Sequence, residues 1–464
     1  MPTSHALPRT ASRLPASPAP AGVGAAPAAL LYFGLGLGLG ACSDGTTAAG
    51  DLGPVAVADL TTFRKLDPAQ PWYGDNRTKL DDFIARTGRQ SATYSPQARP
   101  VATFDWDNTV VKNDVGDATV FFMLRNNKVL QPPMKSWKLV SPFLTVDAAT
   151  ALSAACDAAA AAGQPLPTTT SSACATELVT VYTSAKTTGG KAAFSGWDYR
   201  RMEPAYAFAA QLLSGYTPDE ARQIGGSAVA EALAAAQGTK LTIGTVTGLT
   251  GWVRIYEPIK DLIGTLKDNG FDVWIVSASP QPVVEAAAVQ VGVAADHVIG
   301  IRLLQRSGKL SYDIQGCGDV PDGQLTATGN QGNSLITYID GKRCWINKVI
   351  YGNTSATATN RSTDPSKRTA FAAGDSDTDI TFLQDTVGMR LTLNRNKKEL
   401  MCNAYRNAHG TWLVNPMFIE PLPKLTAGYA CSTTACKDSG GTSVPCRDED
   451  GAVIPDQMDT VFMP

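Results

Sequence analysis

Short apolar runs alternate with helical patterns in two separate parts of the chain. Residues 101–104 have the pattern of a buried strand that leads directly into Asp105, and residues 271–276 form a second apolar, β-rich run. Residues 258–269 place apolar side chains on one helical face, and Gly270 ends that helix. Strands that alternate with helices predict an α/β fold with a parallel sheet. Further strands are predicted over residues 335–339, 369–373 and 390–393.

A helical insertion separates the first strand from the rest of this pattern. It runs from Val110 to Arg254 and contains Ala-rich helical stretches over residues 147–161 and 218–236. The second stretch begins with Thr217 as its N-cap and a proline in its first turn. The chain divides into a leader over residues 1–42, a tether over 43–60, an opening segment with the first core strand over 61–109, the insertion over 110–254, an α/β core over 255–394 and a disulfide-containing tail over 395–464.

The leader has the features of a targeting segment. Arg9 and Arg13 are its only charges, and an apolar stretch from about residue 25 to 40 ends in Leu39-Gly40-Ala41-Cys42. This ending resembles a bacterial lipoprotein signal, in which the cysteine is lipidated. We therefore expect export to the periplasm or cell envelope, with membrane attachment only through a lipid at Cys42. A plain secretory signal and a disordered Ala/Pro-rich tail are the alternatives.

The cysteine count agrees with export. Nine cysteines are present, and eight remain when Cys42 is set aside. An even number in an exported chain predicts disulfides. Zinc is the alternative, but Cys431 and Cys436 lack the spacing of a Cys-x-x-Cys pair. Closeness in sequence favours the pairs Cys156–Cys174 and Cys317–Cys344.

Composition narrows the possible chemistry. Forty Lys and Arg against 42 Asp and Glu give a formal charge of −2, and no dense basic patch interleaves with aromatic residues. Nucleic acid is therefore not expected as the main partner. Only three histidines are present, so multi-histidine metal sites and Ser-His-Asp arrangements have few candidates. Carboxylates must carry most of any catalysis.

Four short polar motifs occur in order, each placed after a predicted strand. In an open α/β sheet the carboxyl ends of the strands form the ligand crevice, so these motifs should converge. Lys342 opens a helical segment and is favoured over Lys348, which lies in its middle. Ser279 is predicted to cap the helix that follows Ser277. The motifs are Asp105-Trp106-Asp107-Asn108-Thr109, then Ser277, then Lys342 or Lys348, and finally Gly374-Asp375-Ser376-Asp377-Thr378-Asp379.

Together these motifs resemble the haloacid dehalogenase superfamily in its aspartate-based phosphatase branch. Residues 262–302 are similar to the phosphoserine phosphatase and phosphorylcholine phosphatase group. The resemblance covers about residues 101–393. It implies a Rossmann-like parallel sheet, with the 110–254 insertion as a mostly helical cap domain. It also implies a Mg²⁺-dependent hydrolase of phosphomonoesters.

The residue types suit that chemistry. Asp105 would attack phosphorus and form an aspartyl phosphate, while a bound Mg²⁺ offsets the charge repulsion. Asp107 would protonate the leaving alcohol and then take a proton from water, and Thr109 would orient Asp107. Asp377 is interpreted as a structural residue of its loop. The resemblance assigns Mg²⁺ to Asp105, Asp107, Asp375 and Asp379, and the phosphate to Ser277, Ala278 and Lys342, with Asp379 also positioning Lys342.

The large insertion favours a small phosphorylated substrate, because a cap that closes excludes water. Asp114 and Asp117 follow the first motif closely, and with aromatic faces they would suit a quaternary ammonium group, as in phosphocholine. The alternative is that the rings are core and the carboxylates surface. Phosphoryl transfer to an acceptor other than water and a degenerate binding lipoprotein are the competing functions. The oligomeric state is not predicted. The aromatic candidates are Trp197, Tyr199, Tyr206, Trp252 and Tyr256.

Overall fold

The computed structural model describes residues 63–326, 329–331 and 335–462 of the chain. The predicted leader, the tether and the lipidation at Cys42 lie outside these residues. Within them, no helix combines the length and the apolar character that a membrane span requires.

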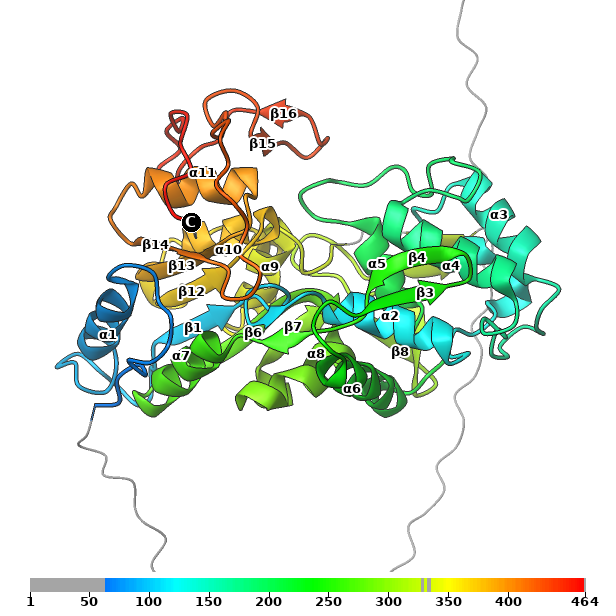
Figure 1. Cartoon of the computed structure of the whole chain (residues 1–464), viewed down its shortest axis with the longest axis horizontal. Coiled ribbons are helices and arrows are strands. Elements are labelled where there is room, and N and C mark those ends of the chain that lie inside the picture. Colours follow the sequence, from blue (N-terminus) through cyan, green and yellow to red (C-terminus); the bar gives the residue numbers. More distant parts are fainter. Residues whose placement is uncertain (1–62, 327–328, 332–334, 463–464) are drawn as a thin grey trace, which may run out of the picture. The chain divides into compact units, whose positions relative to one another are not determined.

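A six-stranded parallel sheet forms the core of the described chain (Figure 1). Its strands lie in the order β14-β13-β12-β1-β6-β7, and every neighbouring pair is parallel. This arrangement confirms the predicted α/β fold. The strands are β1 (Val101–Phe104), β6 (Asp272–Pro280), β7 (Val298–Ile301), β12 (Phe371–Gly374), β13 (Met389–Asn394) and β14 (Trp412–Pro416).

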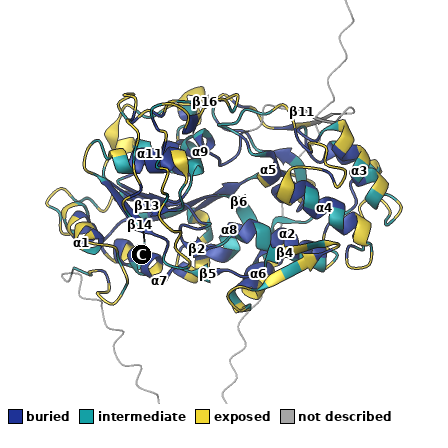
Figure 2. Cartoon of the chain, turned by 45° about the horizontal axis from the view of Figure 1, so that its top comes forward, coloured by how far each residue is buried: buried dark blue, intermediate teal, exposed yellow. Residues whose placement is uncertain are grey.

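Helices cover both faces of this sheet (Figure 1). Strands β1, β12, β13 and β14 are therefore buried along their whole length, as the dark strands in Figure 2 show. Burial on both faces explains why the strands have continuous apolar runs in place of an alternating pattern. The surrounding helices are α1 (Asn76–Thr87), α7 (Glu257–Asp268), α8 (Gln281–Ala288), α9 (Asp340–Val349), α10 (Ile380–Asp385) and α11 (Lys398–Arg406).

The segment between β1 and β6 is mostly helical, and its two ends lie side by side. Strand β2 (Val111–Lys112) pairs antiparallel with β5 (Arg254–Ile255), so the chain leaves the core and returns at one place. Thr217 caps its last helix in a capping box with Glu220, as the sequence predicts. The segment contains α2 (Val115–Arg125), α3 (Val146–Cys156), α4 (Ser172–Ser184), α5 (Pro204–Gln211), α6 (Pro218–Ala234) and the hairpin of β3 (Lys240–Ile243) and β4 (Val246–Thr250).

In the described residues, three further short hairpins lie outside the central sheet, besides that of β3 and β4. They pair β8 (Leu303–Arg306) with β9 (Lys309–Ile314), β10 (Gln324–Thr326) with β11 (Gly329–Gln331), and β15 (Cys436–Lys437) with β16 (Ser443–Val444).

Two sequence predictions of secondary structure are wrong. Residues 335–339 form no strand, because their backbone groups bond to turns and to residues 200–201 rather than to a sheet neighbour. Ile339, at the start of α9, has φ 44°, which no strand accommodates. The predicted helix over residues 147–161 ends earlier, since α3 stops at Cys156.

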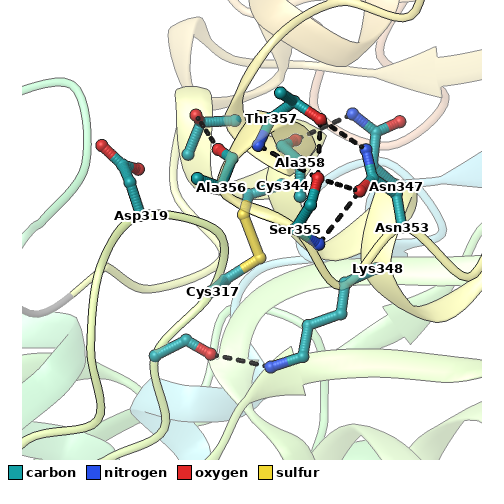
Figure 3. The surroundings of a disulfide bond; sticks show 12 residues. Cys317, Asp319, Cys344, Asn347, Lys348, Asn353, Ser355, Ala356, Thr357 and Ala358 are labelled. Carbon is teal, nitrogen blue, oxygen red and sulfur yellow. Dashed lines mark hydrogen bonds between the residues drawn. A yellow bond between two sulfur atoms is a disulfide. The ribbon is translucent and has the colours of Figure 1, made fainter.

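Four disulfides join the eight cysteines outside the leader. The two predicted pairs, Cys156–Cys174 and Cys317–Cys344, are confirmed. The second ties α9 to the segment after β9 (Figure 3). The zinc alternative is wrong, because Cys431 and Cys436 are each bonded to another cysteine. The two tail bonds are Cys402–Cys431 and Cys436–Cys446.

Helix α6 of the insertion packs closely on α8 of the core at a glycine. A Cβ atom at Gly225 would lie 2.8 Å from Val283 Cα, whereas one at the adjacent Gly226 would meet only Ala286 Cβ, at 3.6 Å. We expect Gly225→Ala to lower the free energy of unfolding by about 1–3 kcal/mol through overpacking. Gly226→Ala should raise it by about 0.5–1 kcal/mol, since alanine favours helix. Urea unfolding of both variants checks this pair, and equal midpoints would contradict the close approach.

Candidate active site

The ends of adjacent strands bring the polar motifs together. Asp105 follows β1, Asp375 follows β12 and Ser277 lies near the end of β6, and these strands are neighbours in the sheet. The third motif differs from the prediction, since Lys342 lies in the first turn of α9 and not after a strand. The structure nevertheless brings Lys342 to the same edge.

Asp105 lies at the centre of this edge and is 5% exposed. Its backbone N–H donates to Ala373 of β12 at 3.0 Å. One carboxylate oxygen accepts from Lys342 Nζ at 2.6 Å, and the other accepts from Thr109 Oγ1 at 3.0 Å. Burial raises the pKa of Asp105, and the charge of Asp379 raises it further, against the opposing effect of Lys342.

Lys342 bridges two buried carboxylates. Its Nζ lies 2.6 Å from Asp105 Oδ1 and 2.6 Å from Asp379 Oδ1, and its side chain has no exposure. Burial alone would lower the pKa of Lys342, but the two carboxylates outweigh burial and raise it. Lys348 instead donates to the carbonyl of Gly316 and lies over the Trp345 ring, away from Asp105 (Figure 3). Of the two candidate lysines, the structure therefore places Lys342 at the site.

Asp375 and Asp379 complete an acidic group with Asp105. Carboxylate oxygens of the three lie within 4.8 Å of one another, and all three residues are buried. Thr109 Oγ1 is 2.8 Å from Asp375 Oδ1, so this hydroxyl lies between Asp105 and Asp375. Asp379 Oδ2 accepts the backbone N–H groups of Asp375 and Ser376, which fixes the loop. An all-oxygen donor set of this kind fits a hard cation such as Mg²⁺.

Asp107 is oriented by three donors. Its Oδ1 accepts the N–H of Val115 at 2.7 Å, and its Oδ2 accepts from Ser279 Oγ at 2.7 Å and from Ser277 Oγ at 3.5 Å. Burial raises the pKa of Asp107 well above its ordinary value, and the charge of Asp114 adds to this. A carboxyl group whose pKa is raised holds its proton more firmly and can act as a general acid.

The structure corrects the predicted roles of Ser279 and Thr109 and agrees with the predicted role of Asp377. Ser279 does not cap α8, because its hydroxyl donates to Asp107 and the capping position is Pro280. Thr109 contacts Asp105 and Asp375 in place of Asp107. Asp377 accepts the N–H of Leu400 at 3.0 Å, in agreement with a structural role.

A cavity of about 520 Å³ opens beside Asp105 and Asp107. Ser279 and Ala278 line it next to these carboxylates. Its remaining wall includes acidic groups and tyrosine rings, and also the cations Arg395 and Lys397. Among the aromatic candidates, Trp252 and Tyr256 are buried in the core, and Trp197 does not line the cavity. The acidic and aromatic lining consists of Asp114, Asp117, Glu203, Asp377, Tyr182, Tyr199, Tyr206 and Tyr338.

Asp117 is a carboxyl group of this lining with a pKa near neutrality. Burial raises its pKa to about 7, and the neighbouring charge of Asp114 contributes. The Tyr182 hydroxyl donates to Asp117 at 2.7 Å and favours the ionised form. A cation in the cavity would stabilise the same ionised form.

Comparison with known proteins follows this geometry. Residues 166–384 match the model of the haloacid dehalogenase-like hydrolase family. The chain contains a haloacid dehalogenase-like hydrolase domain. The matched residues include Ser277, Lys342, Asp375 and Asp379, while Asp105 precedes them.

The chain also resembles individual proteins. It is 38% identical over 64 residues to a phosphoserine phosphatase of Halobacterium salinarum, a match over 14% of this chain and 30% of that protein. The chain therefore spans less than a third of this relative. A functionally unknown protein from Anaerococcus prevotii aligns over 76% of this chain and 94% of its own, with a TM-score of 0.53 and 19% identity. A protein of unknown function from Bordetella pertussis aligns over 68% and 98%, with a TM-score of 0.37 and 16% identity.

Ser279 and Arg395 were not predicted from the sequence as residues of the site. Ser279 holds Asp107, and Arg395 forms an ion pair with Asp375 while lining the cavity. Arg395 lies just past the predicted strand over residues 390–393, so the rule that located Asp375 could also have located it.

Removal of the Lys342 side chain tests how much it contributes to the free energy of unfolding. We expect Lys342→Met to lower the free energy of unfolding by about 3–5 kcal/mol at pH 8, because two buried carboxylates lose their counter-charge. The deficit should shrink towards pH 5, because Asp105, whose pKa is raised, takes up a proton in the folded state as the pH falls. Lys348→Met, the matched control, should cost about 1 kcal/mol or less. Urea unfolding at both pH values checks this, and equal losses would contradict the assignment.

Proposed function

We propose that the protein hydrolyses small phosphomonoesters, with Asp105 as nucleophile and Asp107 as general acid and base. The observation that carries the proposal is the arrangement of these two side chains. Asp105 is held between Lys342 and Thr109, and two residues later Asp107 reaches the same cavity with a raised pKa. The likeness of the domain to hydrolases and to a phosphoserine phosphatase supports the reaction class.

The two carboxyl groups divide the reaction into two steps. In the first, Asp105 attacks phosphorus, the bond to the alcohol oxygen breaks, and Asp107 gives its proton to that oxygen. In the second, Asp107 takes a proton from a water molecule that attacks the aspartyl phosphate and releases inorganic phosphate. Lys342, between Asp105 and Asp379, offsets negative charge on the transferred group.

We also propose Mg²⁺ as the cofactor. Asp105 and Asp375 would hold it, with the backbone carbonyl of Asp107, and Asp379 would support the loop behind them. When bound, the cation supplies positive charge that offsets the repulsion between a carboxylate nucleophile and a phosphate dianion.

The cavity supports phosphocholine as the substrate. Carboxylates and tyrosine rings, among them Asp114, Asp117, Tyr199 and Tyr206, line the same cavity as Asp107, which would protonate the leaving alcohol. A quaternary ammonium group suits such a lining, because aromatic faces and carboxylates attract it without hydrogen bonds. The four disulfides support the further proposal of an exported protein, since such bonds persist in oxidising compartments.

The first test is hydrolysis of p-nitrophenyl phosphate with Mg²⁺. We expect Asp105→Asn to lower kcat by about 10³-fold or more, because the amide cannot attack phosphorus. Asp364→Asn, which changes an exposed carboxylate of another loop, should retain parental kcat. Asp107→Asn should release a burst of p-nitrophenolate equal to the protein concentration and then turn over slowly, because this leaving group needs no proton but the second step needs a base. Equal turnover of Asp105→Asn and the parent would remove the proposal.

The second test compares phosphocholine with glycerol phosphate, an ester of similar size whose alcohol group carries no positive charge. We expect kcat/KM for phosphocholine to exceed that for glycerol phosphate by about tenfold, and this ratio to rise as pH increases through 7 and Asp117 ionises. Asp117→Asn should narrow the ratio and remove its pH dependence. Phosphoethanolamine and phosphoserine extend the series. A ratio near one at every pH would end the phosphocholine proposal while leaving the reaction class intact.

A further inference from the structure

Arg395 brings a positive charge to the acidic group from a neighbouring strand. It directly follows β13, as Asp375 directly follows β12, and these strands pair in parallel with Gly374 opposite Thr392. Arg395 Nη1 donates to Asp375 Oδ2 in an ion pair. The Asp375 side chain is 1% exposed and that of Arg395 is 27% exposed, because the guanidinium also borders the cavity.

This pair occupies a carboxylate oxygen that a cation would need. The Thr109 hydroxyl, which has one proton to share between Asp105 and Asp375, lies 2.8 Å from Asp375 Oδ1, and Arg395 donates to Oδ2. The pair is charge-assisted, and such hydrogen bonds are roughly twice as strong as neutral ones. The buried charges of Asp375 and Arg395 stabilise each other: burial alone would lower the pKa of Arg395, but Asp375 raises it.

The charge balance indicates which partner a cation would displace. The three carboxylates and Lys342 leave a formal excess of two negative charges, which one divalent cation would neutralise. With Arg395 still in place, the excess is one, and a divalent cation would leave the buried group positively charged. Uncompensated buried charge of either sign is unfavourable.

We infer that Arg395 competes with the divalent cation for Asp375. The inference rests on the proposed function only in placing the cation at Asp105 and Asp375. In the cation-free protein Arg395 stabilises the buried carboxylate, and on cation binding the guanidinium moves from Asp375 into the cavity that it already borders. Arg395 is thus a positioning residue that lowers the affinity for the cation and keeps the empty site folded.

The experiment is calorimetric titration of the full chain with MgCl₂, after dialysis against a chelator. We expect Arg395→Gln to bind Mg²⁺ about tenfold more tightly than the parent, which corresponds to the loss of one charge-assisted hydrogen bond. The matched control is Lys397→Gln, which removes another cation of the cavity wall, one that does not contact Asp375. It should keep the parental Kd within about threefold. Without cation, Arg395→Gln should melt at a lower temperature than the parent, and MgCl₂ should raise its melting temperature by more.

A second measurement uses the unaltered protein and so does not depend on the folding of a variant. The Nε–H signal of Arg395 in ¹⁵N NMR, assigned by its absence in Arg395→Lys, should shift as MgCl₂ is added and saturate at the calorimetric Kd. A parental or weaker Kd for Arg395→Gln, an unmoved Nε–H signal, or no Mg²⁺ binding by the parent would each overturn the inference.

Hydrolysis measured in parallel separates the two proposals. Tighter binding by Arg395→Gln in a chain that does not hydrolyse p-nitrophenyl phosphate would support the competition and remove the proposed function. Hydrolysis by the parent, together with an unchanged Kd in Arg395→Gln, would overturn the competition alone.

Discussion

The contact of Lys342 with Asp105 and Asp379 is the interaction on which the rest of the site depends. An ammonium group and two carboxylates are removed from water together, and their opposite charges stabilise each other. Such a group is stable only when its remaining hydrogen-bonding capacity is used. Backbone N–H groups at Asp375 and Ser376 and the hydroxyl of Thr109 provide these bonds.

The position of Lys342 requires an unusual backbone before it. Ile339 has φ 44°, a conformation that is unfavourable for a β-branched residue and therefore needs support from its surroundings. Its N–H donates to Thr378 at 3.1 Å, in the loop that carries Asp375 and Asp379. At Gly341 a Cβ atom would lie 1.7 Å from the carbonyl oxygen of Ile336, so only glycine fits beside the lysine. The strain of this turn and the charges of the site are thus held by the same loop.

Sequence reasoning succeeded where one local rule decides the outcome. Asp105 and Asp375 could be placed because polar residues that follow buried strands meet at one sheet edge. It failed where the hydrogen-bond partners of a residue lie in distant segments of the sequence. The apolar residues 335–339 resemble a strand, but Ile336 and Asp340 donate their N–H groups to Arg201 and Arg200 of the insertion, which no pattern near residue 335 reveals. Ser279 was predicted to cap a helix. Its contact with Asp107 depends on tertiary structure, so the sequence alone does not reveal it.

These same bonds join the insertion to the helix that carries Lys342. The side chain of Arg200 contacts Asp340 at 3.3 Å and Glu399 of α11 at 3.1 Å, and it donates to the carbonyl of Lys437 in the tail. Asp340 begins the helix whose first turn carries Lys342, and the tail around Lys437 is closed by a disulfide. Because Arg200 is bonded to the core on one side and the tail on the other, this part of the insertion cannot move without disturbing α9.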